Sequence, residues 1–280
     1  MPDYTVQINF AALSDKLVRM LDPVIERTAF GLSAADGAAA HPLALPGFFK
    51  VDVAQARKRS FDVVKSESAT WVLASGFREA IDGVHALLEE TRIACAVVDL
   101  GASGDISVEQ WNEHIGGKIK AFHKEFLRPK LEFLNTTYNV TVQPDRLQQL
   151  LSLNAARNCL VHRAGIVSPE HDANVPEGLR VSWRRPELRA VGPAGERSID
   201  ESNRLLDAGG TLQMSVSDTC KLFRAGEKVS FTAQEFSYVC LTLILFGQEL
   251  AQNTVAYAKN RSFPFTPTQA AAGPGGGDPS

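Results

Sequence analysis

Hydrophobic residues recur every three or four positions along most of the chain, which is the pattern of amphipathic helices. The first such stretch, about Ala11 to Phe30, places Leu, Met, Val and Ile on one face of a helix. A second helical pattern runs from Asp52 to about Val98. A single helix of that length would span about 70 Å, so we expect it to bend or break near Ser66–Ser68 or at Gly76.

The next helix has a complete start signal. Ser107 and Gln110 have the spacing of a capping box, in which a hydroxyl and an amide each satisfy a free backbone N–H. We expect a helix from there towards Leu134, and Pro129 either kinks or divides it.

Two further helices follow. One opens at Pro144, because proline is favoured at the first helical position, and it ends at Gly165. The other runs from Ala233 to about Ala258 behind a second capping box, Thr232 and Glu235. This last helix is apolar on most sides in its middle, so we expect it to lie at the centre of the fold.

The segment between these two helices has a different pattern. Its short apolar stretches, 179–188, 211–216 and 220–231, are separated by turn residues and predict two to four strands. The fold class is therefore mainly α, a helical bundle with a small β-containing insertion, about 168–231, before the last core helix. We take 1–263 as one domain and 264–280, which is rich in Ala, Gly and Pro, as a disordered tail.

Composition narrows the class of protein. Hydrophobic residues make up 44% and charged residues 22% of the 280 residues, which is typical of a globular protein. The net charge of -3 does not indicate a nucleic-acid binder, although a local basic patch remains compatible with it. The four cysteines form no CxxC pair, and no apolar run approaches the ~20 residues of a membrane span. We therefore expect a soluble cytoplasmic protein without a metal, a cofactor or a membrane partner.

One group of residues carries candidate chemistry. On the helix that opens at Pro144, Arg157 falls inside the apolar arc, where charged side chains are rare unless they are paired or used. Asn154, Asn158 and His162 follow at intervals of four residues along the border of that arc, so Asn158 can orient the His162 ring. His162 lies in the last turn, where the helix dipole favours an imidazolium.

The sequence NAARNCLVHRAGIV, which contains these residues, resembles the signature of the HEPN superfamily. That signature is an arginine, a polar residue, three further residues and a histidine, here Arg157, Asn158 and His162 around Cys-Leu-Val. The resemblance implies a HEPN-like helical bundle and a metal-independent endoribonuclease of a toxin–antitoxin or antiviral defence system. It also implies a homodimer in which two signature helices face each other, with a possible antitoxin or regulatory partner protein.

The mechanism implied is attack of an RNA 2′-OH on the adjacent phosphate. His162 would move the proton and Arg157 would stabilise the phosphoryl oxygens, while Asn158 would orient His162 or hold a phosphate oxygen. Arg157 and His162 lie about 140° apart around an ideal helix, so one chain does not direct both at a common atom. Two chains across a twofold axis could supply both groups to one cleft.

The insertion supplies candidate RNA-binding residues, in which basic side chains surround an aromatic ring. Such a pattern can hold phosphates and stack bases, and it equally describes a solvated strand with an inward tryptophan. The insertion residues are Arg180, Arg184, Arg185 and Trp183, and Arg163, which lies before the insertion and beside the candidate cleft, joins them on the same electrostatic argument. Two alternatives stand beside the nuclease: a catalytically inactive HEPN module for dimerisation or RNA binding, and a helical scaffold in which Arg157 pairs with a core carboxylate.

Overall fold

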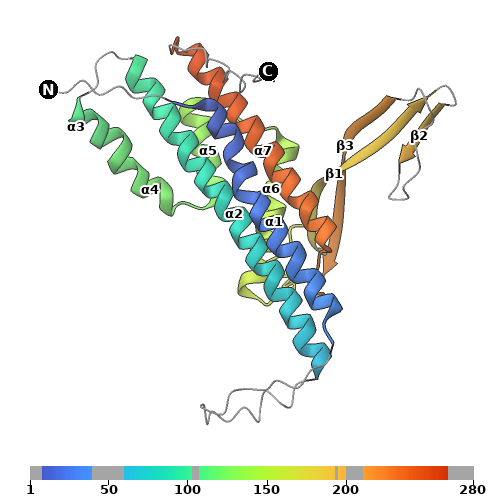
Figure 1. Ribbon diagram of the computed structural model, residues 1–280. Helices are drawn as coiled ribbons and strands as arrows, with labels where there is room; N and C mark the ends of the chain where they lie inside the picture. The colour runs from blue at the N-terminus through green and yellow to red at the C-terminus, as the bar shows by residue number, and fades with distance from the viewer. Residues whose placement is uncertain (1–7, 40–59, 103–106, 193–194, 200–210, 264–280) are drawn as a thin grey trace, which may run out of the picture.

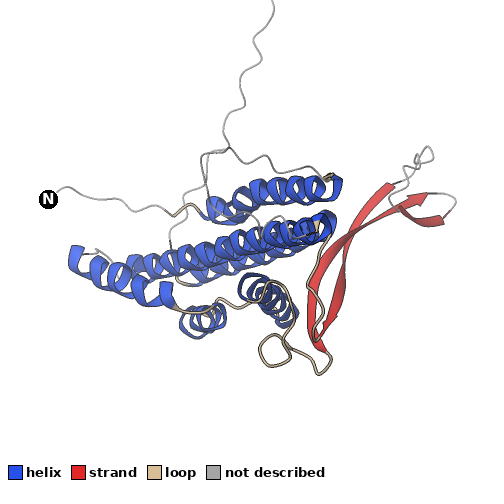
Figure 2. Cartoon of the chain, turned by 90° about the horizontal axis from the view of Figure 1, so that it is seen from below, coloured by secondary structure: helices blue, strands red, loops and turns tan. Residues whose placement is uncertain are grey.

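The computed structural model describes residues 8–39, 60–102, 107–192, 195–199 and 211–263. Long helices pack side by side in a bundle, and a β-ribbon projects from one side of it (Figures 1 and 2). The protein is thus mainly helical with a small β-containing insertion, as the sequence predicts. None of the helices in the described ranges combines the length and apolar character needed to cross a bilayer.

The first two helices form a long antiparallel pair. α1 (Phe10–Gly37) begins at Asn9, whose Oδ1 accepts a hydrogen bond from the Ala12 N–H. α2 (Phe61–Ala102) is a single helix of 42 residues, so the predicted break is wrong. Gly76 is buried where α2 meets α1 and α7 (Ala233–Asn260); a Cβ there would collide with Thr28 Oγ1 and lie 2.9 Å from Phe236 Cζ. This glycine therefore permits close packing of helices and does not interrupt α2.

The chain from 107 to 138 is divided into several short helices. The Ser107–Gln110 capping box is confirmed and opens α3 (Val108–Trp111), which passes through the π-helix η2 (Asn112–Gly117) into α4 (Lys118–Lys124). α5 (Leu127–Tyr138) follows after a break at 125–126. Pro129 lies in the first turn of α5, where its missing N–H removes no helical hydrogen bond. The proline therefore falls where the predicted helix is divided.

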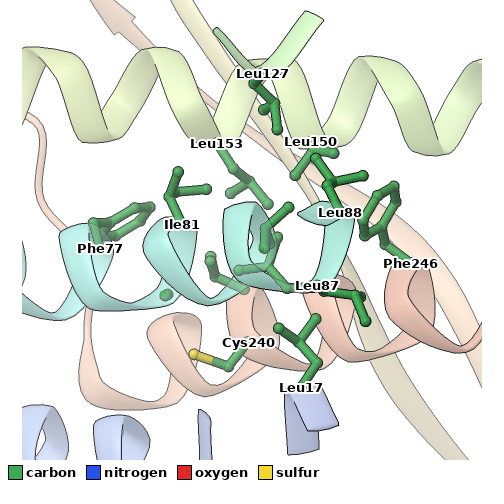
Figure 3. Packing of buried hydrophobic residues seen from close by; sticks show 14 of the residues in the cluster. Leu17, Phe77, Ile81, Leu87, Leu88, Leu127, Leu150, Leu153, Cys240 and Phe246 are labelled. Atoms are coloured by element: carbon green, nitrogen blue, oxygen red, sulfur yellow. The ribbon is translucent and has the colours of Figure 1, made fainter. Parts of the chain in front are cut away.

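The last two helices enclose the centre of the bundle. α6 (Pro144–His162) starts at the predicted proline, and α7 starts at the predicted Thr232–Glu235 capping box. α7 contacts α1, α2, α6 and the ribbon, and it is buried along most of its length, which confirms its central position. Figure 3 shows leucine and aromatic side chains of several helices meeting in this core, among them Leu17, Phe77, Leu88, Leu153 and Phe246.

The insertion between α6 and α7 forms a three-stranded antiparallel sheet. Its strands are β1 (Gly178–Gly192), β2 (Gly195–Ile199) and β3 (Thr211–Arg224), in the spatial order β2-β1-β3. β1 and β3 pair without interruption from Gly178–Arg224 to Val191–Thr211. The base of this ribbon docks on the bundle, and its outer half projects away from it (Figure 2). The tail 264–280 lies outside the described residues.

Candidate functional site

The end of α6 positions the candidate residues. The helix is regular through His162, and the chain then reverses at Ala164 and Gly165, both of which have positive φ. The Gly165 N–H donates to the Cys159 carbonyl over 3.1 Å, which closes the helix end. Because α6 is regular through this region, the separation of about 140° between Arg157 and His162 applies within one chain.

Arg157 is half-buried on α6, and its environment is unusual for a guanidinium. Its Nη1 donates to Asn158 Oδ1 over 3.0 Å, whereas its Nε is buried and has no hydrogen-bond partner in the described residues. No carboxylate in the described ranges lies within ion-pair distance of it. The alternative of a core arginine neutralised by a buried carboxylate therefore finds no partner among those residues.

Asn158 and His162 lie on the outer side of α6. His162 is exposed, and Asn158 is half-buried between it and Arg157. The amide oxygen of Asn158 orients the Arg157 guanidinium, whereas the expected contact between Asn158 and the His162 ring is not among the hydrogen bonds of the described residues. The same outer face carries half-buried apolar side chains, namely Leu147, Leu151 and Val161.

A second histidine, on α2, shares the electrostatic environment of Arg157. His85 is half-buried, and its pKa is lowered first by burial and then by the positive charge of Lys130. Arg157 lowers this pKa further, while the carboxylates Asp82 and Glu89 on α2 oppose the shift. Burial and the nearby cations thus favour the neutral form of the His85 imidazole. The sequence predicts a surface or core-edge histidine at this position, and Asp82 and Glu89, three residues before it and four after it, form a polar stripe with it on α2.

Arg163, predicted to bind RNA, is engaged by a carboxylate of the same chain. Its Nε donates to Asp172 Oδ2 over 2.7 Å, and its Nη2 donates to Asp172 Oδ1. Burial alone would raise the pKa of Asp172, but hydrogen bonds from Arg163 and from the Ser168 N–H outweigh it and lower that pKa. The pair fixes the segment after α6 against the helix end, so Arg163 is not a free cation for phosphate.

The arginines of the ribbon do not gather into one basic surface. Side chains alternate between the two faces of a strand, so Arg180 and Arg184 lie on one face of β1 and Arg185 on the other. Arg184 Nε lies 3.5 Å from Asp218 Oδ1, and Arg185 Nη2 lies 3.5 Å from Glu187 Oε1. Arg180 is exposed and has no ion pair within the described ranges. Of the predicted RNA-binding arginines, Arg180 alone has no carboxylate partner among the described residues.

Trp183 belongs to the core. It is 2% exposed and packs edge to face against Phe231, with ring centroids 5.5 Å apart. A base cannot stack on a ring that is covered in this way. The structure therefore places Trp183 as the inward tryptophan of a docked strand, which was the alternative interpretation of this segment.

Other chemistry is limited in the part of the chain that the structure describes. No group of three or more His, Cys, Asp or Glu residues there is arranged to hold a metal ion. Cys159, three residues before His162, is buried, and burial raises the pKa of its thiol to about 12. A thiol with such a pKa is not a nucleophile near neutral pH.

Comparison with known proteins gives no relative for this chain. No family model, no curated protein and no solved structure matches it.

Proposed function

We propose that this protein is a metal-independent endoribonuclease of the HEPN type, acting in a toxin–antitoxin or antiviral defence setting. The observation that carries the proposal is the state of Arg157. A half-buried guanidinium without a carboxylate partner among the described residues is costly to maintain, because burial of an uncompensated charge opposes folding. A phosphate group of bound RNA would supply the missing negative charge.

The placement of His162 supports the same proposal. It is exposed at the end of α6, so RNA can reach the ring and the ring can exchange protons with solvent. Asn158 accepts a hydrogen bond from Arg157 and thereby holds the guanidinium beside the outer face of the helix. Asn158 thus links the half-buried Arg157 to the accessible face of α6 that carries His162.

We further propose that two chains form the active site. Arg157 and His162 diverge by about 140° on one helix, so a single chain does not direct them at one phosphate. The outer face of α6 carries half-buried Leu147, Leu151 and Val161 beside Asn158, which is a suitable surface for a second α6 across a twofold axis. In such a homodimer each phosphate would meet the arginine of one chain and the histidine of the other.

In the proposed reaction the ribose 2′ oxygen attacks phosphorus and the bond from phosphorus to the 5′ oxygen breaks. A neutral His162 accepts the proton of the 2′-OH, and a protonated His162 donates to the leaving 5′ oxygen. Arg157 donates hydrogen bonds to the phosphoryl oxygens, on which charge increases in the transition state. The products are a 2′,3′-cyclic phosphate and a 5′-hydroxyl, and DNA is not a substrate because it lacks the attacking hydroxyl.

The test is cleavage of total RNA by the purified full chain in EDTA, with the RNA ends identified chemically. We expect the wild type to leave 2′,3′-cyclic phosphates, and we expect Arg157→Ala and His162→Ala each to lower the rate by about a hundredfold or more. Arg19→Ala on α1 and His123→Ala on α4 are matched controls, because both residues are exposed and lie on helices other than α6.

The controls must retain wild-type activity if the proposed site is right. Equal cleavage by all variants would place the activity elsewhere and would refute the assignment of Arg157 and His162. Wild-type protein that binds RNA without cleaving it would support the inactive RNA-binding alternative instead.

A further inference from the structure

The two edges of the ribbon differ in how their backbone hydrogen-bonding groups are satisfied. On β1, the N–H groups of Arg180, Ser182 and Arg184 all point away from β3. They donate to side-chain oxygens over 2.8–3.0 Å, which belong to Asn174, Ser152 of α6 and Thr242 of α7. Further out, Pro186 has no N–H, and from Leu188 onward β2 pairs with this edge. The outer edge of β1 is therefore covered along its length.

These bonds fix the direction of the backbone groups on β3. In an antiparallel ladder, residues alternate between pairs that exchange hydrogen bonds and pairs whose N–H and C=O point outward. The N–H groups of Ser182 and Arg184 point away from β3, so the N–H and C=O groups of their partners on β3, Cys220 and Asp218, point away from β1. Because the register is continuous, the same holds for every second residue of β3. The Arg224 N–H agrees, because it donates to Glu227 and not to β1. The outward residues in the outer half of β3 are Leu212, Met214 and Val216.

This outer half of β3 has no neighbouring strand in the described part of the chain. The run Thr211–Ser217 contains no charge, no proline and no glycine, which are the devices that usually protect an exposed edge from pairing. Leu212 and Met214 are 50% and 72% exposed. Their cross-strand partners on β1, Ala190 and Leu188, extend the same apolar face.

We propose that the edge of β3 that faces away from β1, over Thr211–Ser217, pairs antiparallel with the same edge of a second copy of this chain. Two ribbons then join into one continuous sheet. A twofold axis normal to the sheet always places even-numbered residues opposite even-numbered residues, so the apolar faces of the two ribbons coincide. With Met214 facing its own copy, Leu212 faces Val216, and Gln213 faces Ser215. Apolar residues meet apolar residues, and no like charges meet within Thr211–Ser217.

The backbone geometry agrees with this register. The residues whose N–H and C=O point outward are the same ones whose side chains form the apolar face, so Leu212, Met214 and Val216 would exchange hydrogen bonds with the copy. The interface lies on the ribbon, away from the α6 face proposed for the nuclease dimer. It does not depend on the nuclease assignment.

A charge exchange at Met214 tests the proposal. Met214→Lys and Met214→Glu each place like charges opposite each other on the twofold axis. Neither substitution should disturb the fold of the single chain, because the Met214 side chain is exposed. We expect each variant to have half the mass of the wild type at the same concentration, with a dissociation constant raised about tenfold or more. An equimolar mixture of the two variants should recover the wild-type mass, because lysine then faces glutamate.

Two further variants sharpen the result, with circular dichroism confirming the fold of each. Met214→Pro removes an N–H that the single chain does not use, so it should match Met214→Lys. Gln213→Lys places a charge beside Met214 on the opposite face, where it meets Ser215 of the copy and not itself, so it should retain the wild-type mass. Equal masses for the wild type and the Met214 variants, or no recovery of the wild-type mass on mixing, would each overturn the proposal. Loss of RNA cleavage would not bear on it.

Discussion

The pair between Arg163 and Asp172 gives the sharpest prediction for stability. Asp172 has a side chain that is 1% exposed, whereas Arg163 is 27% exposed. Arg163→Ala removes both guanidinium hydrogen bonds and leaves a buried carboxylate whose remaining contacts include the Ser168 N–H. Breaking a fully buried ion pair costs about 3–5 kcal/mol. Because Arg163 is partly solvated, we expect about 3 kcal/mol for this change.

A double-mutant cycle isolates the interaction. Asp172→Asn should cost about 2 kcal/mol, and the double variant should cost less than the sum of the single variants by about 1.5 kcal/mol or more, because the uncompensated charge is then absent. Urea unfolding followed by fluorescence measures each free energy, and the buried Trp183 provides a signal for unfolding. Arg180→Ala, at an exposed arginine, should stay within about 0.5 kcal/mol of the wild type.

The same pair predicts a dependence on pH. The pKa of Asp172 in the folded protein lies below its usual value, so its stabilisation is present above the unfolded pKa, about 3.9, and is lost as the pH falls through the folded pKa. The difference in stability between the wild type and Asp172→Asn should therefore shrink in acid below about pH 4. Additive costs in the cycle, or a loss under about 1 kcal/mol for Arg163→Ala, would refute the assignment.

Three further predictions concern the core and the cysteines. Gly76→Ala should destabilise the protein by about 1–3 kcal/mol in urea unfolding, because the new Cβ collides with Thr28 across the α1–α2 contact; an unchanged midpoint would contradict this packing. Thr232→Ala removes the side-chain cap on the Glu235 N–H and should cost about 1 kcal/mol, whereas Thr232→Ser should restore most of it. Alkylation of the native protein near neutral pH, followed by mass spectrometry, should add one label per chain, at the exposed Cys220. Burial raises the pKa of the thiols of Cys95, Cys159 and Cys240 to about 12. Early labelling of any of these three cysteines would contradict this prediction.

The features that the sequence predicted well depend on neighbouring residues along the chain. Both capping boxes and the proline at the start of α6 act over three or four positions, so their residue types alone locate the helix starts. The apolar middle of α7 likewise reveals its central position. Such signals require no knowledge of what lies across the bundle.

The features that were missed depend on contacts distant in sequence. Glycine is a residue type that often breaks helices, so the sequence alone suggests this role for Gly76. Only the positions of Thr28 and Phe236 show that Gly76 instead allows α1 and α7 to pack closely against α2. In the sequence Arg163 resembles a free basic residue. Only the structure shows that Asp172, in the irregular segment after α6, accepts hydrogen bonds from its guanidinium. His85 and Arg157 lie on α2 and α6, with α3, η2, α4 and α5 between them in the chain, so no spacing pattern connects them.

The attachment of the ribbon to the bundle along its base alone has a consequence for how this architecture can vary. Ser152 and Thr242 hold only the base of β1, and the closure entropy of the segment between α6 and α7 grows only with the logarithm of its length, about 0.6 kcal/mol for each doubling. The outer ribbon can therefore be lengthened, shortened or exchanged for another hairpin with little effect on the helices. The bundle is in this respect a scaffold that accepts interchangeable arms.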